Sequence, residues 1–360
     1  MGLSMISFKL PSLGADMTEG KLLTWHVKPG DSVKRGQVVA VVDTSKAAID
    51  VEIWQDGVVQ ELLVAPGEKV PVGTVLATLR EPGDVTSAEA ELPVKDSAST
   101  VNPVPVGIQP SANPAEPAVA PAADRQKEMR KAIAAAMSRS KRDIPHYYLA
   151  ETIPLQVATV WLHQRNVGLP ITERILPAAL LLKAVAVALK RTPELNGLYL
   201  DEQFHPSATV HAGVAISLRG GGLVAPAILD AQTKPLPQLM LELADLVKRA
   251  RAGSLRSAEM SDATITVTNL GDQGVESVFG VIYPPQVALV GFGNIVVRPW
   301  VLEGVVSAQP VVHATLAADH RVSDGHRGAL FLAELRDVLQ QPQALDADIT
   351  ATSTHHGDMP

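Results

Sequence analysis

The first 80 residues contain an internal repeat. Residues 20–31 (GKLLTWHVKPGD) match residues 57–68 (GVVQELLVAPGE), an offset of 37 positions from 20 to 57. The match continues at small and apolar positions, where Val33, Gly36, Val38 and Ala40 align with Val70, Gly73, Val75 and Ala77. Each copy alternates short apolar runs with Gly and Pro-Gly turns, which is typical of short strands. Because one copy cannot bury its apolar face alone, the repeat predicts an all-β pseudo-twofold sandwich or flattened barrel.

A different composition follows the repeat. Residues 81–124 contain eight Pro, nine Ala and no aromatic residue. Such a segment cannot bury enough apolar surface to offset its ordering entropy, so we expect a disordered, semi-stiff linker. This expectation divides the chain into a β domain (5–80), the linker (81–124), a larger domain (125–345) and a polar tail (346–360).

The larger domain alternates helical and strand-like patterns. A helix is predicted from Leu236 to Ala252, where Gly253 closes it. The apolar run Ile175–Leu189, interrupted by Lys183, is too short and too charged to span a bilayer and predicts a buried helix. Strands are predicted at Ala208–Leu218, Thr264–Asn269, Val287–Val297 and Val311–Ala317. Together these patterns predict a two-layer α/β domain in which helices cover a sheet.

Composition excludes several classes of function. The net charge is −7 without a basic block, which argues against a nucleic-acid surface. The chain has no cysteine, which excludes disulfides, thiolate metal sites and a cysteine nucleophile and suits a reducing compartment. Residues 1–9 lack the pattern of a signal peptide. We therefore expect a cytoplasmic protein with no membrane, nucleic-acid or metal partner.

A candidate hairpin separates the two copies of the repeat. Ile49, Val51 and Ile53 alternate with acidic residues, which predicts a half-buried strand. Asp43–Ala47 is then the exposed turn, and Lys46 projects from its tip. A solvated turn lysine is the simplest interpretation of such a residue. Its position near the pseudo-twofold centre of a duplicated β domain favours a carrier function instead.

The duplicated domain resembles lipoyl and biotinyl carrier domains over residues 6–80. Lipoyl domains typically read Pro-x-Leu-Gly near the start, Glu-Gly at the first repeat and Thr-Asp-Lys-Ala at the tip. This chain has Pro11-Ser-Leu-Gly14, Glu19-Gly20 and Thr44-Ser45-Lys46-Ala47, with Ser45 where Asp is usual. The resemblance implies lipoate in an amide bond to Lys46. Biotin is the alternative, but biotinyl domains usually have Met on both sides of the lysine, and neither neighbour here is Met.

A second motif lies near the end of the larger domain. Residues 319–325 (DHRVSDG) follow a predicted strand and precede an apolar, helix-like segment, Gly328–Leu339. Histidine followed four residues later by aspartate is common by chance. The structural interpretation is a loop histidine, His320, with Asp324 as a helix N-cap.

Residues 127–342 resemble the catalytic domain of dihydrolipoamide acyltransferases, the core components of 2-oxo acid dehydrogenase complexes, which are related to chloramphenicol acetyltransferase. That family ends in Asp-His-Arg-x-x-Asp-Gly. Other stretches match in order: Arg130-Lys-Ala-Ile-Ala134, Ile144-Pro-His-Tyr-Tyr148, Pro193-Glu-Leu-Asn196, Gly222-Leu-Val-Ala-Pro226, Thr268-Asn-Leu-Gly271 and Pro284-Pro-Gln286. An ordered series of matches is much more specific than any single motif.

The resemblance implies acyl transfer between dihydrolipoyl and coenzyme A, in which a thiol attacks a thioester. A thiol with a pKa of about 8.5 is mostly protonated at pH 7, and a neutral imidazole can take its proton, which makes His320 the implied general base. Thr268 is the implied hydroxyl donor to the carbonyl oxygen, with a surface strand threonine as the open alternative. Asp324 is expected to hold the loop through a salt link, with Arg130 as its candidate partner. His146 is interpreted as a packing residue.

The chain is thus expected to be an acyl-CoA-forming enzyme with lipoate on Lys46 and coenzyme A as substrate. A catalytically silent lipoyl scaffold is the alternative, which the retained His320, Asp324 and Thr268 disfavour. The resemblance implies a homotrimer, or a multiple of it, with sites between subunits. It also implies two partners, a decarboxylating 2-oxo acid dehydrogenase and dihydrolipoamide dehydrogenase. Because residues 81–124 lack the family's helical subunit-binding module, we expect these partners to bind weakly or through another subunit.

Overall fold

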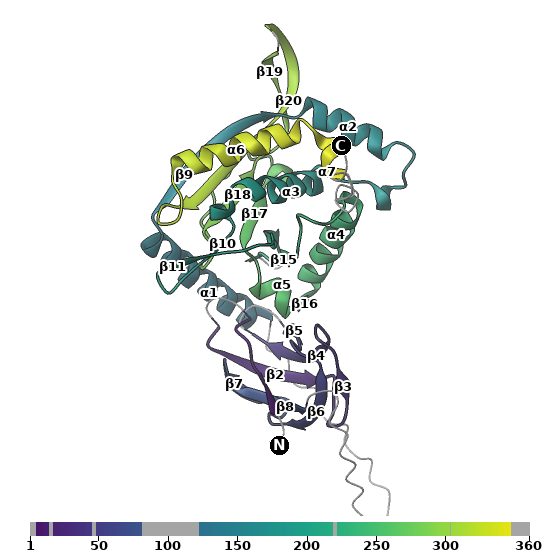
Figure 1. The fold of residues 1–360 in the computed structure, drawn as a ribbon, viewed down its shortest axis with the longest axis vertical. Helices are drawn as coiled ribbons and strands as arrows, with labels where there is room; N and C mark the ends of the chain where they lie inside the picture. Colours follow the sequence, from purple (N-terminus) through teal and green to yellow (C-terminus); the bar gives the residue numbers. More distant parts are fainter. Residues whose placement is uncertain are drawn as a thin grey trace, which may run out of the picture.

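The computed structural model describes residues 5–13, 17–44, 48–80, 122–218, 222–302 and 304–346. They form two folded bodies stacked along the long axis of the molecule, a smaller β body and a larger α/β body (Figure 1). The predicted linker, residues 81–124, lies outside the described residues up to residue 121, and its last three residues belong to a helix instead. Helix α1 (Ala122–Asp143) opens the larger body, and α7 (Pro342–Asp346) ends its described part.

The smaller body contains two small antiparallel sheets. One has the order β1-β8-β6-β3, and the other has the order β5-β4-β2-β7. The strands are β1 (Met5–Lys9), β2 (Glu19–Trp25), β3 (Ser32–Val33), β4 (Val38–Asp43), β5 (Ala48–Glu52), β6 (Gly57–Leu62), β7 (Lys69–Pro71) and β8 (Val75–Arg80). Their inward side chains form one hydrophobic core. The predicted all-β flattened barrel is confirmed.

The strand pairing of this body follows the sequence repeat. Gly20 of β2 pairs with Val70 of β7, and Gly57 of β6 pairs with Val33 of β3. Gly57 lies 37 positions after Gly20, and Val70 lies 37 positions after Val33, so the two pairs are equivalent under the repeat. Each copy of the repeat therefore contributes its short strand, β3 or β7, to the sheet of the other copy. A single copy could not enclose a core for this reason.

The predicted half-buried strand is β5, in which Ile49 and Val51 are buried and their neighbours are partly exposed. Asp43 at the end of β4 pairs with Ala48 at the start of β5, so residues 44–47 connect the two strands. Residues 45–47, including Lys46, lie outside the described residues.

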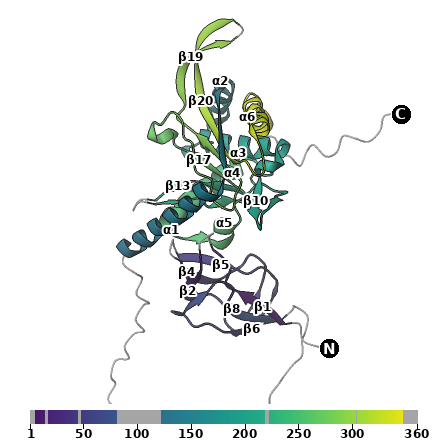
Figure 2. The same ribbon diagram turned by 90° about the vertical axis from the view of Figure 1, so that its left-hand side faces the viewer.

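The larger body is built on a seven-stranded sheet with the order β15-β12-β17-β18-β20-β19, in which β9 also pairs with β20. Its strands are β9 (His146–Pro154), β12 (Ala212–Val214), β15 (Ala227–Ile228), β17 (Ile265–Asn269), β18 (Ala288–Phe292), β19 (Val296–Leu302) and β20 (Val305–Asp319). Strands β12, β17 and β18 run parallel, and the other pairs are antiparallel. The distal parts of β19 and β20 project from the body as a hairpin (Figures 1 and 2).

Helices cover one face of this sheet, which confirms the predicted two-layer α/β domain. They are α2 (Gln156–Asn166), α3 (Pro177–Ala188), α4 (Leu236–Ala252) and α6 (Gly325–Leu339), with the short α5 (Ser257–Ser261). Short 3-10 turns and strand pairs complete the body: η1 (Ile171–Glu173), η2 (Leu189–Arg191), η3 (Pro193–Leu195), η4 (Gly271–Gln273), β10 (Gly197–Leu200), β11 (Gln203–Pro206), β13 (Ile216–Ser217), β14 (Leu223–Val224) and β16 (Leu255–Arg256).

Two helix predictions are confirmed in detail. The predicted helix from Leu236 to Ala252 is α4, and Gly253 closes it with a left-handed φ of 75°. The apolar run predicted to be a buried helix is α3, which lies in the centre of the core. Its lysine, Lys183, is only 1% exposed.

Two strand predictions need correction. Val287–Val297 forms two strands, β18 and β19, because residues 293–295 lie opposite only two residues of β20 and interrupt the ladder. Gly293 is required at this interruption, since a Cβ there would lie 1.8 Å from the carbonyl oxygen of Glu276. The region Ala208–Leu218 likewise contains only the short strands β12 and β13. Among the described helices, none is long and apolar enough to cross a membrane.

Candidate active site

His320 lies on a tight turn directly after β20. The preceding residue, Asp319, is fully buried and forms a bidentate ion pair with Arg321, with an Nη2–Oδ2 distance of 2.6 Å. The guanidinium carbon of Arg321 lies 3.9 Å from the ring centre of Tyr199. Such a bidentate, stacked arginine restricts the turn on both sides of His320. Asp319 and Arg321 belong to the sequence motif around His320, but the motif alone predicts no role for either residue.

The imidazole of His320 is exposed on the described chain. Its ring and that of Tyr147 are arranged edge to face, with ring centres 5.3 Å apart, and the backbone N–H of His320 donates to the carbonyl of Pro145 at 3.0 Å. The Tyr147 hydroxyl lies 2.8 Å from the hydroxyl of Ser323, and burial raises the pKa of Tyr147. His320 is thus held against a rigid aromatic ring while its imidazole faces outward, as a proton acceptor for an incoming substrate must.

Asp324 is the N-cap of α6. Its carboxylate accepts a hydrogen bond of 3.0 Å from the backbone N–H of Arg327, and this bond lowers the pKa of Asp324. The expected salt link to Arg130 is wrong, because no ion pair joins these two residues in the described structure. Arg327, whose backbone N–H binds Asp324, forms its side-chain ion pair with Glu194 and not with Asp324. A carboxylate at a helix N-terminus is satisfied by the unpaired N–H groups there, so the cap replaces the salt link.

Thr268 lies near the end of β17, on the sheet face opposite the helices. Its neighbour Val267 is buried in the helix-side core, whereas Thr268 is half-buried. Two residues earlier on the same face, the Thr266 hydroxyl donates to the side chain of Gln286 at 2.7 Å. No hydrogen bond involves the Thr268 hydroxyl among the described residues. This hydroxyl can therefore donate to a group that comes from outside the subunit.

The sheet register separates Thr268 from His320. Thr268 pairs with Gly291 of β18, which pairs with Thr315 of β20, and His320 lies five residues beyond Thr315. At about 3.3 Å per residue and about 4.8 Å per strand, the two side chains are on the order of 15–20 Å apart. A base and an oxyanion donor must both lie about 3 Å from the reacting groups. One chain alone therefore does not bring Thr268 and His320 into a single site.

His146 has a structural role, as expected. Its Nδ1 donates to the carbonyl of Ile144 at 2.8 Å, and its Nε2 accepts from the backbone N–H of Ile282 at 3.1 Å. Both ring nitrogens are thus occupied, and burial lowers the pKa of His146. The neutral ring ties β9 to the segment that covers the far face of the sheet.

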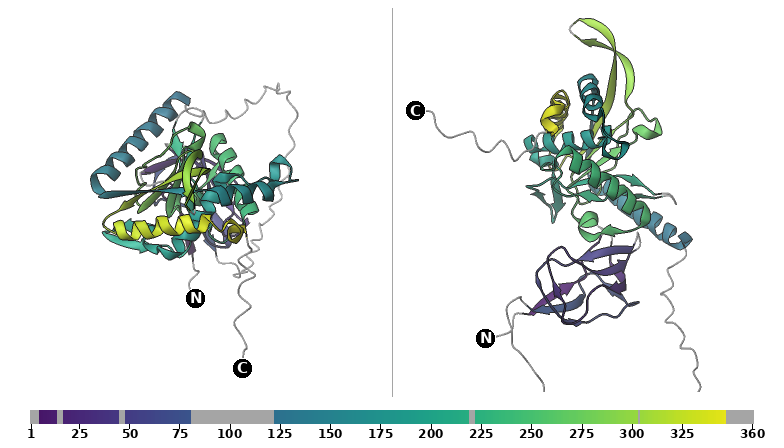
Figure 3. Two further views of the ribbon diagram at one scale, coloured as in Figure 1. Left: turned by 90° about the horizontal axis from the view of Figure 1, so that it is seen from above. Right: turned by 90° about the vertical axis from the view of Figure 1, so that its right-hand side faces the viewer.

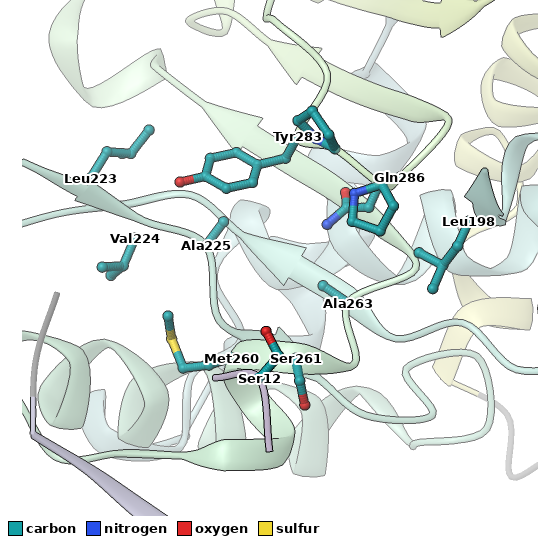
Figure 4. Close-up of a pocket in the computed structure, with 12 residues that line it drawn as sticks. Ser12, Leu198, Leu223, Val224, Ala225, Met260, Ser261, Ala263, Tyr283 and Gln286 are labelled. Carbon is teal, nitrogen blue, oxygen red and sulfur yellow. The ribbon is translucent and has the colours of Figure 1, made fainter. Parts of the chain in front are cut away.

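A cavity of about 200 Å³ lies on this same face (Figure 4). Gln286 and Tyr283 form one side of it, and Met260 and Ser261 of α5 form another. Ser12 of the smaller body also lines it. Since Gln286 holds Thr266, the cavity lies next to the strand that carries Thr268. In the described ranges, no cluster of His, Asp or Glu could hold a metal ion.

Comparisons with known proteins agree with this architecture. The family model for 2-oxoacid dehydrogenases acyltransferase (catalytic domain) matches residues 121–346, and the model for biotin-requiring enzymes matches residues 6–79. A dihydrolipoyllysine-residue acetyltransferase component of the pyruvate dehydrogenase complex from Zymomonas mobilis is 27% identical over 435 residues, covering 94% of this chain and 98% of that protein.

Solved structures resemble the larger body. A probable dihydrolipoamide acetyltransferase from Listeria monocytogenes matches with 29% identity and a TM-score of 0.55, covering 59% of this chain and 92% of that one. The dihydrolipoamide acetyltransferase of Azotobacter vinelandii, in which a serine, a histidine and an asparagine were studied for catalysis, matches with 26% identity and a TM-score of 0.56, covering 60% and 90%. The family match covers well over half of the sequence, and the chain belongs to the 2-oxoacid dehydrogenase acyltransferases, with an additional N-terminal domain of the biotin/lipoyl type.

Proposed function

We propose that this chain transfers an acyl group between a lipoyl arm on Lys46 and coenzyme A. The observation that carries the proposal is the exposed imidazole of His320 on a turn fixed by the buried Asp319–Arg321 pair. A catalytically silent scaffold would not need an outward-facing base held in this way. The match to an acyltransferase catalytic domain supports the enzyme and not the scaffold.

The residues suit thiol–thioester exchange. The His320 imidazole takes the proton of the attacking thiol as the new carbon–sulfur bond forms. The carbonyl oxygen gains negative charge and accepts a hydrogen bond from the Thr268 hydroxyl. The tetrahedral intermediate collapses, the original carbon–sulfur bond breaks, and the departing thiolate recovers the proton from His320. Asp324 fixes the start of α6 and thus the turn that carries His320.

The proposed site is shared between two copies of the chain. Thr268 and His320 are too far apart within one subunit to act on one substrate. His320 is exposed, and the half-buried Thr268 has a hydroxyl with no hydrogen-bond partner among the described residues. The projecting hairpin of β19 and β20 also exposes large apolar residues that are each more than half exposed: Val297, Val301, Leu302, Val305 and Val306. Exposed apolar patches of this kind mark protein–protein contacts. A homotrimer, or a multiple of it, is the assembly that the family resemblance implies.

The smaller body fits a carrier of lipoate. The register of Asp43 with Ala48 leaves a short connection, residues 44–47, at one end of a closed β body, and Lys46 belongs to it. A lipoyl group there supplies a dithiol that carries the acyl group. The matched family model covers biotin-type domains as well, and the residues beside Lys46 favour lipoate.

We further propose that the chain works in a 2-oxo acid dehydrogenase-type complex in the cytoplasm. The Zymomonas mobilis relative is a component of such a complex. Its alignment spans 435 positions against 360 residues of this chain, so at least 75 of those positions, the difference between the two numbers, have no counterpart here. Weak recruitment of the partner dehydrogenases is consistent with this shorter chain.

The test is an assay of acyl-CoA formation from acetyl-, succinyl- and branched-acyl-dihydrolipoamide with the full chain. We expect turnover with one of these acyl groups and a loss of about 10²- to 10⁴-fold in His320→Ala, the scale of a lost general base. Equal turnover by the two proteins would remove His320 from the mechanism. An unmodified Lys46 in a lipoylating host would remove the carrier role.

A further inference from the structure

The two folded bodies are joined by strand pairing. The edge strand β5 of the smaller body runs parallel to β16 of the larger body, with Ile49 opposite Leu255 and Asp50 opposite Arg256. Strand β16 thereby extends the sheet to the order β16-β5-β4-β2-β7. Figure 1 shows β5 of the smaller body next to α5 and β16, and Figure 2 and the right view of Figure 3 show the same contact between the two bodies from the sides. An edge strand offers unpaired backbone groups, and strand addition is a common means of protein recognition.

Side chains reinforce the strand contact. The backbone N–H of Glu52 donates to the hydroxyl of Ser257 at 3.2 Å, and the Glu52 carboxylate accepts a hydrogen bond from the backbone N–H of Ala258. Arg256, Glu259 and Asp262 are the charged groups around Glu52, and only Arg256 attracts it. The last residues of β5 thus meet the first residues of α5 through both backbone and side-chain hydrogen bonds.

Apolar packing continues across the contact. Met260 packs against the cores of both bodies. Beside it, Ser12 of the smaller body lines the cavity that Gln286 and Tyr283 close from the other side (Figure 4). The interface therefore combines backbone strand pairing, hydrogen bonds at the start of α5 and apolar packing of Met260.

The contact runs along β5, the strand that follows the 44–47 connection. Strand β5 begins at Ala48, directly after this connection, and pairs with β16 from its second residue. Ser12 precedes β2, whose Lys21 pairs with Asp43 at the opposite side of the same connection. Both ends of the connection are thus anchored in strands that lie at or beside the contact with the larger body.

We propose that residues Leu255–Ser261 form a docking surface for the lipoyl-type domain, which binds by adding its β5 edge to β16. The occupant is a lipoyl-type domain and no other partner, because three contacts are made to this domain. Strand β16 pairs with β5, the start of α5 binds Glu52, and Met260 packs against the core of the smaller body. The docking places Ser12 of this domain at the cavity beside the strand that carries Thr268. Its role as delivery of the acyl group rests on the proposed function, whereas the docking itself does not.

The first test uses the absence of cysteine from the chain. Asp50→Cys and Arg256→Cys place two thiols on ladder partners, within the range of Cα separations that a disulfide spans. The full chain, produced without lipoate, is treated with a mild oxidant that accepts the two electrons and two protons of disulfide formation. The control is Gln60→Cys with Arg256→Cys, because Gln60 is an exposed residue of β6 in the other sheet.

We expect the Asp50/Arg256 pair to form a disulfide at least about tenfold faster than the control pair, since only the ladder partners are held in bonding range. A disulfide within one chain or between two chains supports the surface, because both join β5 to β16. Equal rates for the two pairs would overturn the proposal. This result does not depend on lipoylation or catalysis.

The second test separates docking from chemistry. Arg256→Glu should repel Asp50 and Glu52, and it should slow acyl transfer from the domain-borne arm to coenzyme A by about two- to fivefold, the scale of an exposed charge contact. Turnover of free dihydrolipoamide should be unchanged, because the small substrate needs no docking. Glu52→Arg combined with Arg256→Glu should restore the rate. An equal loss with both substrates, or no loss with either, would contradict delivery by this surface; failure of the wild-type chain with free dihydrolipoamide would instead contradict the proposed function.

Discussion

Complementation between two inactive variants tests the arrangement of the site directly. His320→Ala lacks the base, and Thr268→Ala lacks the hydroxyl donor. Within one chain the two side chains are on the order of 15–20 Å apart by the register through Gly291 and Thr315, so each site must draw one group from each of two subunits. In a cyclic trimer refolded from equal amounts of the two variants, an interface is intact when its His320 and its Thr268 both come from unmutated positions. For random assembly this occurs at about one interface in four.

The mixed sample should therefore recover about a quarter of the wild-type turnover with free dihydrolipoamide, for a cyclic homo-oligomer. Each variant alone should lose about 10²-fold or more, and Thr268→Ser should lose little because it keeps the hydroxyl. The assay measures acyl-CoA formation after joint unfolding and refolding, with each variant refolded alone as the control. Light scattering on the same samples gives the number of subunits. If joint refolding leaves turnover at the level of the single variants, both groups act within one chain and the reasoning from the register is wrong.

Three other changes have defined outcomes. Lys46→Arg should abolish a single lipoyl adduct seen by intact mass in a lipoylating host; a biotin adduct, or lipoyl on another lysine, would contradict the assignment. Asp324→Ala should lower the midpoint of urea unfolding, because it removes the N-cap bond to Arg327, and Asp324→Asn should lower it less. Burial lowers the pKa of Lys183 to about 8. The unfolded chain then binds more protons than the folded chain above pH 8, so the free energy of unfolding, relative to Lys183→Met, should rise between pH 8 and 10. A flat or falling difference would show that the three backbone carbonyls bonded to Lys183 keep it charged.

The β domain could be predicted closely from the sequence because its information is local and repeated. The offset of 37 residues appears in the pairs Gly20–Val70 and Gly57–Val33, so the pseudo-twofold barrel follows from the repeat itself. The helix from Leu236 to Ala252 was likewise predictable, since its apolar period and its closing glycine are neighbours in sequence. The ordered motifs identified the acyltransferase family and singled out His320 and Thr268 as candidates.

Other features depend on contacts between distant segments, which no local pattern contains. The interruption at Gly293 depends on the backbone of Glu276, because the carbonyl oxygen of Glu276 lies so close that there is no room for a Cβ at residue 293. Asp324 caps α6 rather than pairing with Arg130, because its carboxylate accepts a hydrogen bond from the backbone N–H of Arg327 in the first turn of that helix. The separation of Thr268 from His320 depends on the register of three strands, and the β5–β16 contact joins residues about 200 positions apart. The sequence by itself determined which chemical groups this protein carries, whereas only the tertiary structure decided which of them meet, because strand register and packing are set by long-range contacts.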